Sequence, residues 1–269
     1  MIYKNDNLVV LLPANISKNI LFSHQGLTYG GFIMCKELNT LEVDEIFKSL
    51  FQFLKSEEIN YLELKLLPHF YKKNPTNIVS DYLVSINADK FRTDMVLAID
   101  YSAALHIHKT KLKHFRRNTN RGFEIKEESS LDIFWNKVLI PRLKEKHNTV
   151  PVHSLKEIMS LKSIFPNQIR QFNIYLDGKI LAGITIFDKG SVVKSQYGAT
   201  TIAGQHERAL EFLFIHLINK FKEEGKTFFS MGTVRDTSKS EGYNEGLLKQ
   251  KQELGCTVFY QNFYKIDVI

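Results

Sequence analysis

A lysine close to the C-terminal end of the chain carries the clearest chemical hypothesis. Asn244, Leu247 and Lys251 are spaced by three and four residues, so they share one face of the helix expected over Asn244–Leu254. A lysine in such a place can hold negative charge in a substrate or a transition state, or exchange a proton if its pKa is shifted. The alternative is a solvated surface lysine like Lys249, because lysines are very common on exposed helix faces.

Other polar side chains could transfer protons. Tyr197 lies in a predicted strand over Ser191–Thr200, and Asp236 and Tyr243 lie in or beside the polar loop Gly232–Gly242. Phenol and carboxylate groups act as general acids and bases when they lie within hydrogen-bond reach of a substrate. These three side chains are therefore candidates for proton transfer. For Asp236 taken alone, a surface turn is the competing interpretation.

The loop and helix start over Thr200–Arg208 could bind a phosphate. The first amides of a helix lack intrahelical partners, and together with the helix dipole they attract anions. Gly204 permits a close approach of the backbone, and Arg208 could add a charge-assisted hydrogen bond. The alternative is an ordinary helix N-terminus with a flexible glycine. The candidate cofactor-binding residues are Thr201, Gly204, Gln205 and Arg208.

A basic segment lies in the middle of the chain. Lys109–Arg121 carries six positive side chains and no acid, and Arg117 and Arg121 lie at the end of the helix expected there. A substrate phosphate, a pyrophosphate-linked lipid or a tRNA backbone could lie on this segment. The alternative is a solvated helix face. His106 and His108 are two residues apart and do not share a helix face, so we expect no metal site.

Composition sets broad limits on the class of protein. The 269 residues are 43% hydrophobic, which argues against disorder. Cys35 and Cys256 are too few for a disulfide scaffold or a structural zinc site. No apolar run approaches the length of a membrane span and no export signal is visible, so we expect a cytoplasmic protein. The net charge of +7 favours anionic partners without choosing among nucleotide-linked sugars, coenzyme A, tRNA and lipid head groups.

The pattern of predicted elements divides the chain near Asp100–Ser102. The first part has a small α/β pattern, with a helix over Leu41–Lys55 and strands that include Thr28–Cys35 and Tyr61–Leu67. The second part has a hairpin across Asp177-Gly178, because that dipeptide favours a two-residue turn. Beyond the strand Ser191–Thr200 we expect a helix from Gly204–Gln205 to Lys222, then strands over Thr227–Met231 and Cys256–Phe263. We expect these later strands to form one mixed sheet.

The residues of the last quarter resemble the end of the Fem-type peptidyltransferases. That family has a fold of the GNAT N-acetyltransferase type and adds amino acids to peptidoglycan precursors. Its pattern is Asp-Phe-Gly at a strand end, then Gly-Leu, two residues, Phe-Lys, two residues and Phe-Gly. In this chain Ser230-Met231-Gly232 replaces the first element, Gln250 and Leu254 replace the two aromatics, and Lys251 keeps the lysine.

The resemblance extends upstream and covers the chain from Arg92 to Tyr264. Arg92-Thr93-Asp94 before the strand Val96–Asp100, followed by Lys113–Arg121, is similar to the family's strand and Arg/Lys-rich helix. It implies an α/β (α+β) fold with two tandem GNAT-like lobes and a mixed central sheet flanked by helices. A reduced N-terminal lobe would occupy residues 1–100, and a catalytic lobe residues 101–269. The extreme C-terminus, Asp267–Ile269, could return to the first lobe.

The resemblance also implies a function. It suggests an N-acyltransferase that moves an acyl or aminoacyl group from an activated donor to an amine, on a peptidoglycan precursor or an amino sugar of the cell envelope. Acyl-coenzyme A is an open choice of donor. The chain shows no room for the long coiled-coil arm of some Fem-type enzymes, which argues against an aminoacyl-tRNA donor. The implied catalytic residues are Lys251, Tyr197 and Tyr243, and the implied substrate-binding residues are Arg117, Arg121, Asp236 and Asn244.

Two other classes of function compete with this one. A non-catalytic module could retain the GNAT fold and bind an anionic ligand; the aspartate that is missing before Met231-Gly232 and the weak phosphate loop favour it. An RNA-binding protein would rest on the net charge of +7 alone.

Overall fold

The computed structural model describes residues 1–27, 30–72 and 77–268, and the chain forms two compact units. Unit 1 consists of Met1–Met95 and Phe259–Ile269, and unit 2 consists of Val96–Val258. This division differs from the expected lobes 1–100 and 101–269, because the chain returns to unit 1 from Phe259 onward rather than from Asp267. In the described part of the chain, no helix is both long enough and apolar enough to cross a membrane.

Unit 1 contains two sheets. The smaller has the strand order β1 (Ile2–Lys4), β2 (Asn7–Leu11) and β5 (Ile33–Met34). The larger has the order β3 (Asn15–Ser17), β4 (Ile20–Phe22), β6 (Tyr61–Lys65), β13 (Thr257–Asp267) and β7 (Asp89–Asp100). Its helices are α1 (Thr40–Ser56), the 3-10 helix η1 (His69–Tyr71) and α2 (Ile78–Ser85). Of the strand expected over Thr28–Cys35, residues 28 and 29 lie outside the described residues, and β5 covers only its later part.

Helix α1 packs on the larger sheet of unit 1 through an alternating strand. Asn39 and Glu42 form a reciprocal capping box with two 3.0 Å hydrogen bonds, which satisfies amides at the helix start. Leu62 and Leu64 of β6 are fully buried in the same hydrophobic core as Phe47 of α1. This alternation of buried and half-buried residues confirms the strand predicted over this part of the chain.

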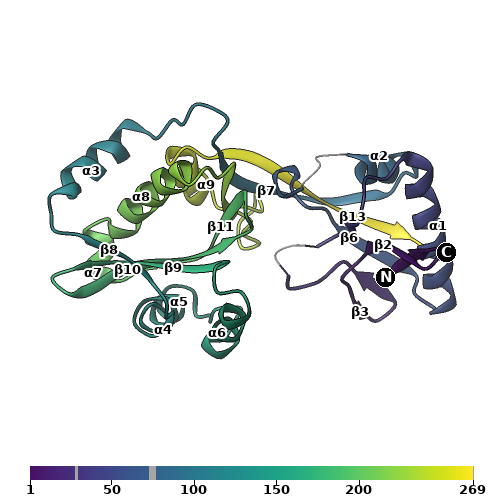
Figure 1. The fold of residues 1–269 in the computed structure, drawn as a ribbon, viewed down its shortest axis with the longest axis horizontal. Helices are drawn as coiled ribbons and strands as arrows, with labels where there is room; N and C mark the ends of the chain where they lie inside the picture. Colours follow the sequence, from purple (N-terminus) through teal and green to yellow (C-terminus); the bar gives the residue numbers. More distant parts are fainter. Residues whose placement is uncertain (28–29, 73–76, 269) are drawn as a thin grey trace. The chain divides into compact units, whose positions relative to one another are not determined.

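Unit 2 contains the remaining strands of the ten-stranded sheet that includes the larger sheet of unit 1, with helices on both faces. Its strand order is β7, β12 (Phe228–Thr233), β11 (Val192–Thr200), β10 (Lys179–Asp188), β9 (Ile169–Leu176) and β8 (Glu124–Glu128). Its helices are α3 (Lys109–Thr119), α4 (Asp132–Phe134), the π-helix η2 (Trp135–Leu139), α5 (Ile140–His147), α6 (Leu155–Ile164), α7 (Ile202–His206), α8 (Ala209–Glu223) and α9 (Glu245–Glu253). Helices α3 and α8 cover one face of this sheet, and α4, α5 and α6 cover the other (Figure 1).

The centre of unit 2 folds as the sequence predicts. Strands β9 and β10 are joined by Asp177 and Gly178, whose φ angles of 49° and 72° are those that a tight hairpin turn requires. Helix α8 lies against the sheet through a buried face with helical spacing. The buried residues of this face include Phe212, Leu213, Ile215 and Leu217.

The helix expected from Gly204–Gln205 to Lys222 is two helices. Arg208 has a left-handed backbone with φ of 55° and stands between α7 and α8 as the N-cap of α8. A left-handed residue cannot continue a right-handed helix, so the chain changes direction there. The N-terminus that the sequence placed near Gly204 is therefore followed by a second N-terminus at Arg208.

Each unit contains the same arrangement of two parallel strands joined by a helix. In unit 1, β4 and β6 are parallel and α1 connects them; in unit 2, β11 and β12 are parallel and α8 lies between them in the chain. The next neighbour is antiparallel in both cases, β13 beside β6 and β7 beside β12. The strand expected over Cys256–Phe263 is β13, which belongs to the same ten-stranded mixed sheet as β9 to β12, as predicted, and pairs with β6 over Phe263–Asp267.

Candidate active site

Strands β11 and β12 of unit 2 stop pairing part of the way along their length. Their parallel register joins Val192–Lys194 to Phe228–Ser230. Beyond these residues β11 continues to Thr200 and β12 continues to Thr233. The two strands therefore continue beyond the paired segment without pairing with each other. The backbone of β11 after Lys194 and the last carbonyls of β12 lie at the same end of the paired segment.

Lys251 holds the end of β12. In the pairing of β12 with β7 the register shifts between Ser230 and Gly232, so Met231 is an inserted residue. The Lys251 ammonium donates to the carbonyls of Met231 at 2.6 Å, Thr233 at 2.9 Å and Gly232 at 3.3 Å. The Lys251 residue is only 9% exposed. It is therefore not the solvated lysine of the competing interpretation.

The surroundings of Lys251 restrict what it can do chemically. Burial lowers its pKa to about 8, and burial raises the pKa of the neighbouring Cys256 thiol to about 12. A protonated lysine has three N–H donors, and the three carbonyls of β12 can use them all. Lys251 can reach a substrate only by giving up one of these carbonyls, and it loses one donor when it releases its proton.

The polar loop before α9 is held together by Asp236 and Asn244. Asn244 caps α9, and its side-chain oxygen accepts a 2.9 Å hydrogen bond from an amide in the first turn. Hydrogen bonds from Ser238 lower the pKa of Asp236, with a smaller contribution from Asn244. Arg235 and the half-buried Tyr243 form an isolated bridge in the same loop. The structure thus brings three of the predicted site residues together, and the lowered pKa makes Asp236 a weak proton acceptor.

Tyr197 of β11 forms a hydrogen-bonded pair with His153, a residue that the sequence analysis missed. The Tyr197 hydroxyl lies 2.6 Å from Nδ1 of His153 and accepts a 3.3 Å hydrogen bond from the His153 backbone amide. Burial raises the pKa of Tyr197. A phenol and an imidazole in contact can pass a proton between them. His153 directly precedes Ser154, the N-cap of α6, and that position was its only signal in the sequence.

The π-helix η2 lies against this pair. The rings of Trp135 and Tyr197 meet edge to face, with centroids 5.0 Å apart. Trp135 is fully buried, and its indole N–H has no hydrogen-bond partner within the described residues. Pro141 follows shortly after the π-helical turn, and it lacks the amide that an ordinary helical hydrogen bond would need. Widened turns of this kind are frequent at functional sites.

The predicted phosphate loop is largely occupied by its own contacts. The Thr201 hydroxyl caps α7 by accepting a 2.9 Å hydrogen bond from the Gly204 amide. A side chain at Gly204 would lie 2.2 Å from the carbonyl oxygen of Leu181, so the glycine allows close packing against β10. Gln205 accepts a hydrogen bond from Arg142. The Gly204 amide is thus used inside the protein.

Helix α3 is only partly accessible to a ligand. Lys111 is 8% exposed, and its ammonium lies 2.7 Å from Glu211 and 3.3 Å from Glu253. Arg121 lies 2.5 Å from Glu207. Two cations of the basic segment therefore bind acids of unit 2, and the segment is not uniformly solvated.

Two further cations of α3, Lys113 and Arg117, lie near Arg208 at the start of α8. Burial lowers the pKa of His114, and the nearby Arg208, Arg117 and Lys113 lower it further. These three cations are exposed, and only Arg208 has an acidic partner among the described residues, Glu211 at 3.6 Å. We call Lys113, His114, Arg117 and Arg208 the basic cluster. It joins Arg117, which the sequence analysis assigned to substrate, to Arg208, which it assigned to cofactor.

Comparison with known proteins identifies the fold of this chain. No protein-family model and no curated protein matches the sequence. FemX matches with a TM-score of 0.65 and 11% identity, over 83% of this chain and 77% of FemX. L-PGS from Bacillus licheniformis matches with a TM-score of 0.61 and 12% identity, over 98% of this chain and 82% of that one. A tandem GNAT protein from the clavulanic acid biosynthesis pathway matches with a TM-score of 0.50 and 7% identity, over 93% and 76%.

The chain therefore has a GNAT-like fold of the Fem type, with two GNAT-like lobes in tandem and a mixed sheet flanked by helices. This confirms the fold class expected from the sequence. The repeated pair of parallel strands, β4 with β6 and β11 with β12, is the element that both units share.

Proposed function

We propose that unit 2 transfers an acyl or aminoacyl group from an activated donor to an amine. The observation that carries this proposal is the end of the pairing between β11 and β12 at Lys194 and Ser230. The Tyr197–His153 pair belongs to the first strand, and the buried ammonium of Lys251 fixes the end of the second. The resemblance to the Fem-type enzymes supports the same class of reaction.

The reaction requires one bond to form and one to break. The amine nitrogen attacks the carbonyl carbon of the donor, and the tetrahedral intermediate collapses as the thiolate or alkoxide leaves. The amides of β11 beyond Lys194 that do not face β10 would donate to the carbonyl oxygen as it becomes negative. The Tyr197–His153 pair accepts the proton that the amine loses, or supplies one to the leaving group.

Lys251 acts in this scheme through β12. Its donors fix the three carbonyls that follow Ser230, and its positive charge lies at the end of that strand. We assign it as a positioning residue, which contacts substrate only if one of the carbonyls is released. Asp236, Tyr243 and Asn244 form the neighbouring loop and are assigned to the acceptor.

The basic cluster supports a donor that carries phosphates. Acyl-coenzyme A is the donor that we propose, because its pyrophosphate matches the exposed cations Lys113, Arg117 and Arg208. An aminoacyl-tRNA would also match such a cluster through its backbone, and is the donor to compare with it. The proposed acceptor is an amine on a peptidoglycan precursor or an amino sugar, which the resemblance alone supports.

Acyl transfer can be tested with thiol release from acetyl-coenzyme A. The full chain is incubated with acetyl-coenzyme A and a panel of amines that includes glucosamine and lysine-containing peptides. We expect release of the free thiol that depends on both substrates and falls at least tenfold in Tyr197→Phe. Tyr175→Phe is the matched control, because that hydroxyl binds Glu128 and Asn173 on another part of the sheet. Equal thiol release by both variants would contradict the assignment of Tyr197.

A non-catalytic binding module is the second candidate, and two contacts favour it. The Lys251 donors are used by β12, and the Gly204 amide is used by Thr201, so two groups expected at the reaction are engaged elsewhere. This candidate predicts saturable binding of coenzyme A or tRNA with no acyl transfer to any amine. Binding to the native state then raises the unfolding temperature by mass action, which a thermal-shift assay measures.

A further inference from the structure

The sheet of unit 1 has one apolar face and one polar face. Successive side chains of a strand point to opposite faces, so Leu62 and Leu64 of β6 join the core formed with α1. Glu63 and Lys65 alternate with them and lie on the other face. Phe263 of β13 pairs directly with Lys65 and is on the same face. This second face therefore carries charge beside a large aromatic ring.

A cavity of about 200 Å³ opens on this polar face. It forms where β4 ends, because the parallel pairing of β4 with β6 stops at Phe22 and Glu63. The Ser23 amide donates to the Glu63 carbonyl at 2.8 Å, and the Ser23 hydroxyl accepts a 2.7 Å hydrogen bond from the Lys65 amide. The chain then turns away from β6 at Gly26, whose φ is 80°, while β6 continues to Lys65. The cavity thus lies beside β6 where β4 would run if that strand were longer.

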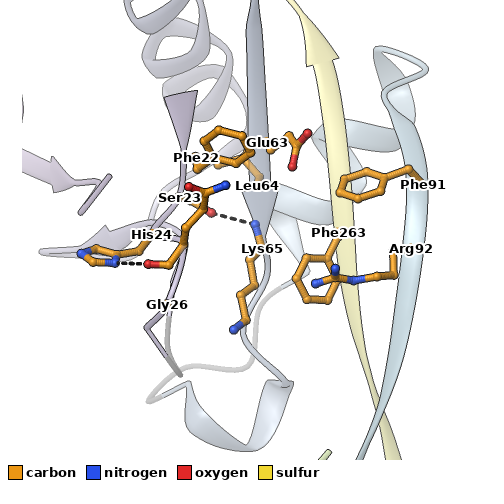
Figure 2. Close-up of a pocket in the computed structure, with 11 residues that line it drawn as sticks. Phe22, Ser23, His24, Gly26, Glu63, Leu64, Lys65, Phe91, Arg92 and Phe263 are labelled. Atoms are coloured by element: carbon orange, nitrogen blue, oxygen red, sulfur yellow. Dashed lines mark hydrogen bonds between the residues drawn. The ribbon is translucent and has the colours of Figure 1, made fainter. Parts of the chain in front are cut away.

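Two cations meet in this cavity at the ring of Phe263 (Figure 2). The guanidinium carbon of Arg92 lies 3.4 Å from the ring centroid, and the ammonium of Lys65 lies 5.8 Å from it. Lys65 extends toward the Gly26 turn, whereas the Glu63 carboxylate lies at the other end of the group, toward Phe22. The cationic end of the cavity is therefore separated from its one carboxylate.

The charges at this end favour an anion. Lys65 donates one hydrogen bond, to the Leu27 carbonyl at 3.0 Å, and makes no ion pair among the described residues. Burial lowers the pKa of Lys65, and the neighbouring Arg92 lowers it further. Arg92 lies 3.3 Å from Asp94, so the three groups together keep a positive charge. An anion between Lys65 and Arg92 would stabilise both cations in a partly buried place.

An apolar surface continues from the cations. Phe91 lines the same cavity and is 43% exposed, so its ring is accessible to a ligand there. The guanidinium of Arg92 lies 6.0 Å from its ring centroid. A ligand with an anionic group at Lys65 could place a planar or apolar group against Phe91.

We propose that this cavity of unit 1 binds a small ligand through a phosphate or carboxylate group held by Lys65 and Arg92, with its planar or apolar part on Phe91. The site is built from unit 1 residues alone. It is separate from the acyl-transfer site proposed in unit 2, and neither proposal depends on the other.

Three probes test this site in the full chain at low ionic strength, with binding measured by calorimetry. Inorganic phosphate, phenyl phosphate and benzoate distinguish the anion from the group attached to it. We expect phenyl phosphate or benzoate to bind at least tenfold more tightly than inorganic phosphate, because the ring adds contact with Phe91. Phe91→Ala should remove this difference and leave the binding of inorganic phosphate unchanged.

Lys65→Met should weaken the tightest probe by about tenfold or more, as expected when a charged hydrogen-bond donor is lost. The matched control is Lys265→Met on the adjacent strand, whose ammonium lies 4.1 Å from the ring of Tyr61. It should change binding by less than about twofold. Circular dichroism establishes whether each variant is folded. If Lys65→Met is not folded, Phe91→Ala still tests the proposal. Absence of saturable binding for all three probes, or equal weakening by both lysine variants, would overturn the proposal.

Discussion

The ammonium of Lys251 donates a 2.6 Å hydrogen bond to the carbonyl of Met231, the residue inserted into β12 where its register with β7 shifts. A bulge leaves backbone groups without partners in the strand ladder. Lys251 supplies donors to three successive carbonyls at this point. Its first role is therefore to support the backbone on which the proposed site depends.

This contact predicts a measurable loss of stability in Lys251→Met. An exposed lysine at this place would change stability by no more than about 1 kcal/mol when substituted. Because Lys251 is 9% exposed and serves three carbonyls, we now expect the free energy of unfolding to fall by about 2 kcal/mol. Urea unfolding followed by circular dichroism measures this change.

The matched control for that variant is Lys249→Met. Lys249 is exposed on the same helix, so its substitution should change the unfolding free energy by less than about 0.5 kcal/mol. Thiol release from acetyl-coenzyme A should fall by on the order of a hundredfold in Lys251→Met and stay near the original rate in Lys249→Met. A Lys251→Met protein as stable as the control would show that the three hydrogen bonds contribute little.

The lowered pKa of Lys251 predicts how stability depends on pH. In the folded protein its pKa is about 8, and the ordinary value is 10.5. Between these values the unfolded chain holds a proton that the folded protein has released. The free energy of unfolding therefore rises with pH across this window through Lys251. Below pH 8 both states hold the proton, and the contribution no longer changes.

Other buried lysines also make the free energy of unfolding rise with pH. The contribution of Lys251 is therefore measured as the difference between the original protein and Lys251→Met. Burial also lowers the pKa of Lys65, Lys72 and Lys162. Urea unfolding of the original protein and of Lys251→Met at several pH values between 7.5 and 10.5 isolates the Lys251 part. The original protein should show the steeper rise, and parallel curves would mean that the pKa of Lys251 is not lowered.

Local patterns predicted much of unit 2, because they depend on residues close in the chain. The Asp177-Gly178 turn and the buried face of α8 follow from turn chemistry and helical spacing. The exchange of β13 into unit 1 could not be found in this way. A strand with suitable alternation can pair with many partners, and the partner of β13, β6, is chosen by contacts far away in the sequence.

The candidate site was predictable in its parts and not in its contacts. The helical spacing that groups Lys251 with Asn244 gives a common direction, but it says nothing of burial or of the carbonyls that Lys251 meets. Nothing near His153 in the sequence indicated its contact with Tyr197, since the two residues lie on different elements. The Arg208 backbone, with φ of 55°, ended a helix that the apolar spacing alone would continue.

The pair formed by Tyr197 and His153 predicts coupled effects on catalysis. Tyr197→Phe removes the hydroxyl and keeps the ring that packs on Trp135, so it should lower stability by only about 1 kcal/mol. Each of Tyr197→Phe and His153→Gln should reduce thiol release at least tenfold. If the two act as one proton path, the double variant should be little worse than either alone. Effects that multiply in the double variant would instead assign them separate roles.

The packing of Gly204 predicts that this glycine is needed for the fold of α7. A methyl group there would lie 2.2 Å from the Leu181 carbonyl oxygen and 2.5 Å from the Thr200 hydroxyl. We expect Gly204→Ala to lower the free energy of unfolding by about 1–3 kcal/mol, as overpacking against backbone does. Gly246→Ala in α9 is the control, since its nearest neighbour is 3.4 Å away and alanine favours a helix. A silent Gly204→Ala would mean that α7 can move from β10.

The basic cluster predicts a salt-dependent contact with the donor. Arg117 is exposed and makes no ion pair among the described residues, and it lies with Arg208 near His114. Arg117→Gln should weaken the binding of coenzyme A by roughly fivefold, because one partly screened charge contact contributes about 1 kcal/mol. It should also flatten the dependence of affinity on salt, since fewer charges are then screened.

Lys222→Gln removes the same charge from the exposed end of α8 and should change neither quantity. Calorimetric titrations at two salt concentrations measure both. If the two variants lose affinity equally, the net charge of the protein attracts the donor and the cluster does not bind it.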